Sequence, residues 1–396
     1  MLINFLSDEF INNPYPFYAQ LLATEEPYFL PTFDVIKKEG IWLFSRYDDV
    51  IQLLKETKAV SKKIRNSKNP EHYSIFDLHL LNQDAPTHTR LRNLINKAFS
   101  SEKIKALEPK INQIIDDFIA PMKEKSQIDF VNDFARPVPI AIISELMGVP
   151  FSDYESVRDW TMTIGRSFDS AFVTEQSLQQ QAIALKEVTH YFIYLIDYYR
   201  RHNSDNLISY LIQMSDNNNE LSYDEMLSML ILILFAGHET TVNLLSNGLL
   251  SLLRYPEQFE LLKQHPEYMN SAIDEMLRFE SPAQRTTFRV TIEPLQINGH
   301  WIEAGQQIAG LIGAAHRDSA YFSNPDTFDI TRNPNPHIAF GVGAHVCLGS
   351  LLARAEAKIA FAKILTALPD LHLAESAPVW NKTTFFRSLQ SLPVCC

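Results

Sequence analysis

Apolar and polar residues recur along most of this 396-residue chain with the period of an α-helix, which predicts a mainly helical protein. Helical periodicity is strongest over residues 104–122, 140–147, 178–199 and 256–277. Two other regions have strand and turn patterns instead. Residues 33–45 predict a hairpin that turns at Glu39-Gly40, and residues 286–313 predict a second β region around the turn signal Asn298-Gly299.

One helix is expected to be much longer than the others. Ser222 and Glu225 have the spacing of a capping box, and the apolar pattern that follows them extends to about Arg254. At about 1.5 Å per residue, such a helix crosses the molecule. Its longest apolar stretch, residues 226–236, is interrupted by Ser228 and is too short to span a bilayer.

Composition and charge narrow the class of protein. Hydrophobic residues make up 46% of the chain, enough for a large core, and 12 glycines are few for a loop-rich or all-β protein. The net charge of −12 argues against non-specific nucleic-acid binding. Residues 1–18 lack the basic start and apolar centre of a signal peptide. Because no linker or repeat divides the chain, we expect a single domain over residues 1–396, monomeric, soluble and cytoplasmic, without a membrane anchor.

The candidate chemistry centres on Cys347, because the other two cysteines, Cys395 and Cys396, are the last two residues. Cys347 lies in residues 340–349, Phe-Gly-Val-Gly-Ala-His-Val-Cys-Leu-Gly, just before an amphipathic helix over residues 351–365. The free N–H groups at a helix start favour an anion, so this thiol is expected to lose its proton more easily. Phe340 can shield the sulfur from water. The glycines of the loop let the backbone approach a flat ligand closely; they are Gly341, Gly343 and Gly349.

The sequence of this loop is more specific than a lone cysteine, which is usually a small core residue. A dinucleotide-binding loop is excluded because Val346 stands where the third glycine belongs. Residues 340–349, including His345, resemble the haem-binding loop of the cytochrome P450 superfamily, and five motif blocks follow the family's order. The resemblance implies the cytochrome P450 fold, a single large helical domain with small β-sheets. It also implies haem b between the long helix and this loop, with the Cys347 thiolate as the axial iron ligand.

The long helix contains Ala236-Gly237-His238-Glu239-Thr240-Thr241, where a carboxylate and a hydroxyl interrupt an apolar stretch. Taken alone, Thr240 would bond back to the carbonyl of Ala236, and Glu239 would be an exposed charge. A zinc-protease motif is excluded because position 242 is valine. The stretch resembles the family's oxygen-activation sequence. That resemblance implies that Gly237 loosens the helix over the haem, that Thr240 donates a hydrogen bond to dioxygen and that Glu239 delivers protons through water.

Further residues match family positions that hold the haem or support its loop. Glu275 and Arg278 have i, i+3 spacing, which alone usually means a surface pair, but the resemblance implies that they are buried with Arg332 and support the fold. The positions that bind the haem propionates match His88, Arg92, Arg289 and His345. The resemblance also places four residues against the haem, namely Ala236, Gly237, Phe340 and Gly349.

Two groups of basic residues have different interpretations. Lys62, Lys63, Arg65 and Lys68 are expected in a solvated loop rather than in a binding patch. A second group flanks the haem-loop and propionate elements, and such a basic face on an acidic protein favours docking of a small acidic ferredoxin or flavodoxin. This group consists of Arg90, Lys97, Arg354 and Lys358.

Together these motifs predict a bacterial-type haem-thiolate monooxygenase, which inserts one atom of O₂ into an organic substrate and releases the other as water. Because the chain has no visible NAD or flavin module, the electrons of NAD(P)H are expected through a separate ferredoxin or flavodoxin and its reductase. The alternatives are a fatty-acid hydroxylase or a peroxygenase of the same fold, a non-catalytic haem sensor, and a helical protein without haem. The acid and alcohol at positions 239 and 240 disfavour the peroxygenase and the sensor.

The substrate is expected to be hydrophobic and medium-sized to large, because the positions that form the pocket in the family are mainly apolar and aromatic here. A polyketide or macrolide intermediate or a terpenoid fits this description, with either hydroxylation or epoxidation as the reaction. The pocket positions are Phe76, Phe168, Phe172, Phe235, Ala283, Phe288 and Phe386.

Overall fold

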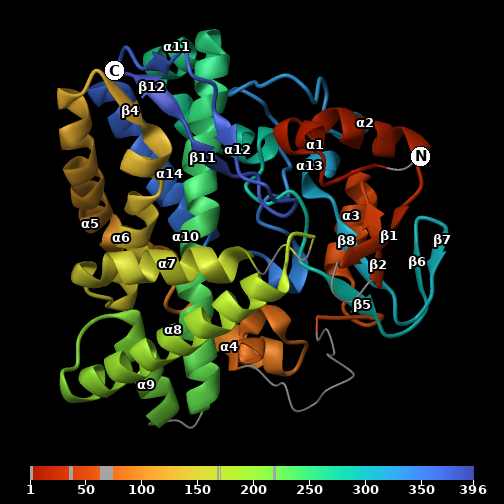
Figure 1. Cartoon of the computed structure of the whole chain (residues 1–396), viewed down its shortest axis with the longest axis horizontal. Helices are drawn as coiled ribbons and strands as arrows, with labels where there is room; N and C mark the ends of the chain where they lie inside the picture. The colour runs from red at the N-terminus through yellow and green to blue at the C-terminus, as the bar shows by residue number, and fades with distance from the viewer. Residues whose placement is uncertain (1–2, 35–38, 63–74, 167–168, 170, 217–219) are drawn as a thin grey trace.

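The structure is a computed structural model that describes residues 3–34, 39–62, 75–166, 169, 171–216 and 220–396. A long helix, α10 (Tyr223–Arg254), runs through the middle of the molecule, and other helices pack around it (Figure 1). The largest sheet lies to one side of this helical part (Figure 1). The mainly helical fold with small sheets is therefore confirmed.

The remaining α-helices of the described residues vary from one turn to 27 residues. They are α1 (Asp8–Asn12), α2 (Tyr15–Thr24), α3 (Tyr47–Lys55), α4 (Thr87–Asn96), α5 (Ser101–Ile119), α6 (Pro137–Met147), α7 (Tyr154–Gly165), α8 (Glu175–Arg201), α9 (Leu207–Asp216), α11 (Pro256–Gln264), α12 (Met269–Phe279), α13 (Ile312–Ala315) and α14 (Ser350–Ala367). Short 3₁₀ turns include η1 (Ile75–Leu78), η2 (Leu80–Asn82) and η8 (Gly343–His345).

The strands form one larger sheet and three small ones within the described residues. The larger sheet has the order β1-β2-β8-β5-β3, in which β2 and β8 are parallel. The small sheets are β4-β12-β9, β6-β7 and β10-β11. The bounds are β1 (Tyr28–Asp34), β2 (Glu39–Phe44), β3 (Val60–Ser61), β4 (Gln127–Asp129), β5 (Arg289–Thr291), β6 (Leu295–Ile297), β7 (His300–Ile302), β8 (Gln307–Gly310), β9 (His372–Leu373), β10 (Val379–Trp380), β11 (Leu389–Ser391) and β12 (Pro393–Cys395).

Local signals in the sequence account for several element ends. Ser222 caps α10, its side chain accepting from the amide of Glu225 while the Glu225 carboxylate accepts from the amide of Ser222. Asn298 and Gly299 both have positive φ, 47° and 89°, and connect β6 to β7 as the turn signal predicted.

Two predicted boundaries were wrong. The stretch 256–277 is not one helix, because α11 ends before Pro266, whose ring and missing N–H are incompatible with a continuous helix. The first hairpin does not turn at Glu39-Gly40, since both residues belong to β2; residues 35–38, between β1 and β2, lie outside the described residues.

The core surrounds α10. From Met226 to Phe235 every residue of α10 is buried, and α10 contacts α6, α7, α8, α12 and α14. By length and composition α10 is the one described helix that could cross a membrane, but 78% of its most apolar window is buried inside the protein. Its apolarity is therefore that of a core helix packed on all sides.

Candidate functional site

The loop before α14 brings Cys347 to the start of that helix. Gly341 and Gly343 have φ values of 68° and 78°, which glycine adopts without the usual steric cost. The amide of Cys347 donates to the carbonyl of Phe340 at 2.8 Å and closes the loop. A Cβ at Gly343 would lie 3.0 Å from the carbonyl oxygen of Leu54 on α3, so the loop packs tightly against that helix.

The pKa of the Cys347 thiol is raised, not lowered as the sequence predicted. Desolvation of the sulfur is the largest cause, although Cys347 as a residue is exposed. The backbone N–H groups of Gly349 and Ser350 and the charges of Arg92 and Arg354 all act to lower it. The predicted stabilisation at the helix start is therefore present, but desolvation outweighs it. Because a coordinated metal deprotonates a thiol outright, the same donors suit a metal-bound sulfur.

The oxygen-activation segment lies within α10. This helix runs without a break through residues 236–241, so its helical assignment is not interrupted at Gly237. A Cβ at Gly237 would lie 2.8 Å from the Cδ1 of Ile143 on α6, and glycine is needed there because another helix approaches closely. The Thr240 hydroxyl donates to the carbonyl of Ala236 at 3.0 Å, the local bond expected of a mid-helix threonine. Ala236 itself is accessible although Phe235 is buried.

Glu239 is not an exposed charge on a solvated face. It is only partly accessible, and burial raises the pKa of its carboxyl group. The positive charges of Arg136 and Arg166 and a hydrogen bond from Ser388 act in the opposite direction. Glu239 therefore has an environment in which the protonated and ionised forms are closer in free energy than in water.

The predicted propionate ligands lie together. The rings of His88 and His345 are 4.1 Å apart, and Arg92 Nη1 donates to the carbonyl of Val346 at 2.7 Å. Burial lowers the pKa of His345 to about 2, and the next causes are the charges of Lys62, His88, Arg289 and Arg92. We call the group formed by Lys62, His79, His88, Arg92, Arg289 and His345 the basic cluster.

Arg289 has a structural task besides the one predicted. Its guanidinium donates to the carbonyls of Leu53 at 2.6 Å, Leu54 at 3.1 Å and Glu56 at 2.9 Å, and so caps the last turn of α3. Burial lowers its pKa to about 10, although Asp84 and Glu56 act to raise it. The end of α3 thus fixes the position of this cation.

Two members of the basic cluster, Lys62 and His79, were not predicted from the sequence as site residues. Lys62, predicted in a solvated loop, is only 5% exposed, so that interpretation was wrong for it. Lys63, Arg65 and Lys68 lie outside the described residues. His79 is 1% exposed, and no partner is found for either ring nitrogen among the described residues. The burial of Lys62 was not predicted, because the basic residues that follow it give the whole segment the pattern of a solvated loop.

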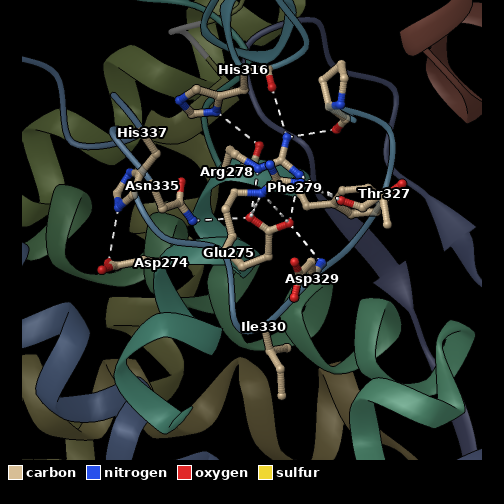
Figure 2. Close-up of polar contacts among 12 residues, drawn as sticks. Asp274, Glu275, Arg278, Phe279, His316, Thr327, Asp329, Ile330, Asn335 and His337 are labelled. Atoms are coloured by element: carbon tan, nitrogen blue, oxygen red, sulfur yellow. Dashed lines mark hydrogen bonds and ion pairs between the residues drawn. The ribbon is translucent and has the colours of Figure 1, made fainter. Parts of the chain in front are cut away.

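The supporting ion network is as the resemblance implied (Figure 2). Glu275 and Arg278 are 0% and 1% exposed, and two hydrogen bonds of 2.7 Å join them. Arg332 Nε donates to Glu275 at 3.1 Å, as does the amide nitrogen of Asn335. Arg278 also donates to the carbonyl of His316, whose Nε2 accepts from the backbone of Ile338 just before the cysteine loop. The network thus connects α12 to the segment that leads into Cys347.

The predicted basic face is partly neutralised. Arg90 forms an ion pair with Glu225, and Arg354 pairs with Asp274 at 2.7 Å. Lys97 and Lys358 are exposed, and no ion pair is found for either within the described residues. Of the four predicted residues, Lys97 and Lys358 are therefore the two whose charge is free to attract an acidic partner protein.

The predicted pocket residues divide between two hydrophobic clusters. Phe76, Phe235 and Phe386 belong to the main core cluster, and Ala283 forms a β-bridge with Phe386. Phe172 and Phe288 pack instead against the cluster around the N-terminal helices and β2. Phe168 lies outside the described residues. A separate cavity of about 520 Å³ is lined by Tyr15, Arg254, Arg317 and others, but by none of the predicted site residues.

Comparison with known proteins identifies the family. The helical fold and the cysteine loop define a haem-thiolate protein. The cytochrome P450 family model matches residues 35–377, and the chain belongs to this family. The polyketide biosynthesis cytochrome P450 PksS of Bacillus subtilis is 38% identical, with 98% of this chain and 96% of that protein covered.

Two solved structures have the same fold. The P450BioI complex with an acyl carrier protein that bears hexadec-9Z-enoic acid has a TM-score of 0.91 and 35% identity, and covers 98% of this chain and 100% of that one. The tirandamycin C-bound P450 monooxygenase TamI has a TM-score of 0.88 and 34% identity, and covers 98% and 99%. The chain is thus a bacterial-type cytochrome P450 monooxygenase with a haem-thiolate cofactor.

The residues of this chain fit haem. The basic cluster holds three strong cations, Lys62, Arg92 and Arg289, and the described residues place two carboxylates near them, those of Asp84 and Glu56. Both carboxylates accept hydrogen bonds from backbone amides, and no ion pair is found for the three cations among the described residues, so the two propionates would supply counter-ions. The Nε2 atom of His88 is buried without a hydrogen-bond partner, and the position of a Cβ on Gly349 has no atom within 4 Å.

Proposed function

We propose that the enzyme oxygenates a hydrophobic secondary metabolite of the polyketide class, with Cys347 as the iron ligand and Glu239 and Thr240 controlling protons. The observation that carries the proposal is the glycine-framed Cys347 loop beside a basic cluster whose three cations, Lys62, Arg92 and Arg289, have no ion pair among the described residues. PksS, a relative with 38% identity over almost the whole chain, acts in polyketide biosynthesis according to its name.

Haem, when bound to Cys347, supplies the activation of O₂. The chain's own groups supply protons and exclude water. The Thr240 hydroxyl donates to the carbonyl of Ala236 at 3.0 Å and keeps its lone pairs for an accepted hydrogen bond. Rotation about its Cβ–Oγ1 bond would turn the proton toward a bound oxygen atom instead. Glu239 carries a proton to this position, because burial raises its pKa while Arg136 and Arg166 keep the ionised form accessible.

The apolar pocket positions Phe76, Phe235 and Phe386 orient the substrate by burial and exclude bulk water. P450BioI takes an acyl chain on a carrier protein, so a polyketide intermediate is supplied either free or on a carrier. The peroxygenase and the sensor are less favoured, because the Glu239–Thr240 pair serves proton delivery to dioxygen. The fatty-acid hydroxylase is less favoured because the relative PksS acts in polyketide biosynthesis according to its name.

Electrons of NAD(P)H arrive through a separate ferredoxin or flavodoxin and its reductase in the cytoplasm, since the chain resembles the single-domain P450 enzymes. Lys97 and Lys358 are the exposed charges available for docking. The double variant Lys97→Glu/Lys358→Glu is expected to slow reduction by ferredoxin about tenfold at low salt, and less at high salt. Lys186→Glu, a reversal on exposed α8, is the control. Equal reduction rates in all three proteins would contradict the docking site.

The thiolate is tested by spectroscopy. The reduced protein with carbon monoxide is expected to show the red-shifted Soret band of thiolate ligation, and Cys347→Ser is expected to lose it. Cys395→Ser is the matched control and keeps the band. If the parent protein lacks the band, or if Cys347→Ser retains it, the proposed function is wrong.

The proton and substrate roles are tested by turnover. Thr240→Ala is expected to retain haem and substrate binding but to divert electrons to peroxide. In Thr241→Ala, which lacks a hydroxyl 3.5 Å from the Gly237 carbonyl, electron use is expected to remain coupled to substrate oxygenation.

The substrate class is tested by the low-spin to high-spin conversion on titration with free polyketide lactones, carrier-bound polyketide acyl chains and fatty acids. A response to fatty acids alone would overturn the polyketide assignment.

A further inference from the structure

Lys62 is a buried lysine with neutral partners. It follows β3 directly and is 5% exposed. Its ammonium donates to the hydroxyl of Thr287 and approaches the carbonyl oxygen of Phe288 at 3.4 Å. Neither group carries a charge. A buried ammonium that meets only neutral acceptors is costly, because such partners replace little of its hydration free energy.

The surroundings of Lys62 add positive rather than negative charge. The pKa of Lys62 is lowered to about 7, chiefly by burial and then by the charge of Arg289, while Asp84 acts to raise it. Asp84 is already shared, since one carboxylate oxygen accepts from the Ser61 hydroxyl and the other from the backbone amide of Lys62 at 2.9 Å. Asp84 therefore holds the backbone of this segment and leaves the ammonium without an ion pair among the described residues.

His79 gives an independent indication of a missing acceptor. Both of its ring nitrogens are buried, and neither has a partner of good hydrogen-bond geometry in the described part of the chain. Burial lowers the pKa of His79 to about 3, and the charge of Lys62 contributes in the same direction, while the backbone of His79 itself acts to raise it. The ring packs edge-on against Phe76 at 4.5 Å, so its orientation is fixed by an aromatic neighbour. A neutral ring held in this way presents one N–H donor beside the Lys62 ammonium.

We propose that Lys62 binds a haem propionate directly, with His79 as a neighbouring donor, so that the cofactor is held by residues beyond the four predicted from the sequence. This inference rests on the proposed haem site. The ligand is the carboxylate of the porphyrin side chain, because the charge of Arg289, which matches a propionate position and is held by the carbonyls of α3, acts on Lys62. The alternative is a structural lysine that only joins β3 to the Thr287–Phe288 segment.

The two possibilities differ in what Lys62→Met changes. If Lys62 binds a propionate, this variant loses a charge-assisted hydrogen bond, and haem transfer from the holoenzyme to a haem-scavenging acceptor protein becomes about tenfold faster. The propionate bending band in the resonance Raman spectrum shifts, and the ferric/ferrous potential falls because a positive charge near the iron is lost. Lys58→Met, an exposed lysine four residues earlier, leaves all three quantities unchanged.

Lys62→Arg provides the second arm if Lys62→Met does not fold. It keeps the positive charge, so haem transfer stays near the parent rate, but the propionate band shifts because a guanidinium replaces the ammonium. Parent-like haem transfer and propionate bands in both folded variants would overturn the inference. Every variant is also measured as the reduced carbon monoxide complex. A parent protein without the thiolate band contradicts the proposed function, whereas normal thiolate bands with unchanged propionate bands contradict only the role of Lys62.

Discussion

Two buried groups of charged residues in this protein have opposite electrostatic balances. Around Glu275, every strong donor has a protein acceptor, since Arg278 and Arg332 donate to its carboxylate and to carbonyls of neighbouring loops. In the basic cluster, Lys62 and His88 are also buried, but Asp84 and Glu56 accept from backbone amides, and no ion pair is found for Lys62, Arg92 or Arg289 among the described residues.

The difference separates structural from ligand-binding charge. A network that satisfies its own hydrogen bonds stabilises the fold without help, and removing a member leaves an unpaired buried charge. A group of like charges without counter-ions costs free energy unless a ligand supplies them. Residue type does not distinguish the two cases, because arginine takes part in both. The balance of charge does.

The largest expected effect is in the satisfied network. Glu275→Gln removes the shared anion and leaves Arg278 and Arg332 buried together, so we expect a loss of roughly 3–5 kcal/mol in the free energy of unfolding. Chemical denaturation followed by circular dichroism measures this loss. Glu257→Gln, an exposed site on α11, is the control and is expected to change stability by less than about 0.5 kcal/mol. Equal stability of the two variants would mean that the network is not structural.

Glu239 lies between the two cases, since Arg136 and Arg166 balance its charge while burial raises its pKa. Glu239→Gln cannot release a proton and is expected to lower turnover about 100-fold with little change in stability. In the parent enzyme, turnover through this group falls as pH rises through its raised pKa, because the proton donor is lost. The variant has no such dependence. An identical pH profile in the two proteins would remove Glu239 from the proton path.

A smaller effect is expected in the basic cluster. Arg92→Met removes one of the three cations and its 2.7 Å bond to the Val346 carbonyl. Haem transfer to an acceptor protein should become about tenfold faster, because a charge-assisted hydrogen bond is lost. The stability of the haem-free protein should stay the same or rise, since one like charge has been removed. A large loss of stability without faster haem transfer would make this cluster structural as well.

The smallest effect is expected at the edge of the network. Burial acts to raise the pKa of Asp274, but hydrogen bonds from His337 and Arg354 and their charges outweigh it and lower the pKa. The folded pKa is thus below the unfolded one, so this pair stabilises the protein above the unfolded pKa of about 3.9 and stops doing so as pH falls through the folded value. Because both partners are about one-third exposed, Asp274→Asn should cost less than about 1 kcal/mol at neutral pH.

The sequence was sufficient for features that depend on short segments. The capping box at Ser222, the turn at Asn298-Gly299 and the positive-φ glycines of the cysteine loop follow from local backbone preferences. Pro266 itself indicates a helix break, but helical periodicity continues on both sides of it and favours a single helix.

The burial of individual side chains and the charge balance around them could not be predicted from short segments of sequence. Lys62 has the local sequence of a solvated residue, and only the packing of β3 against β5 encloses it. The tight approach of Ile143 to Gly237 and the raised pKa of Cys347 likewise depend on elements far apart in the chain. Local preferences act over a few neighbouring residues, so the sequence determines the helices, their caps and the cysteine motif. Desolvation and electrostatic interactions depend on every nearby atom, so the tertiary structure alone decides which charges are satisfied and which require a ligand.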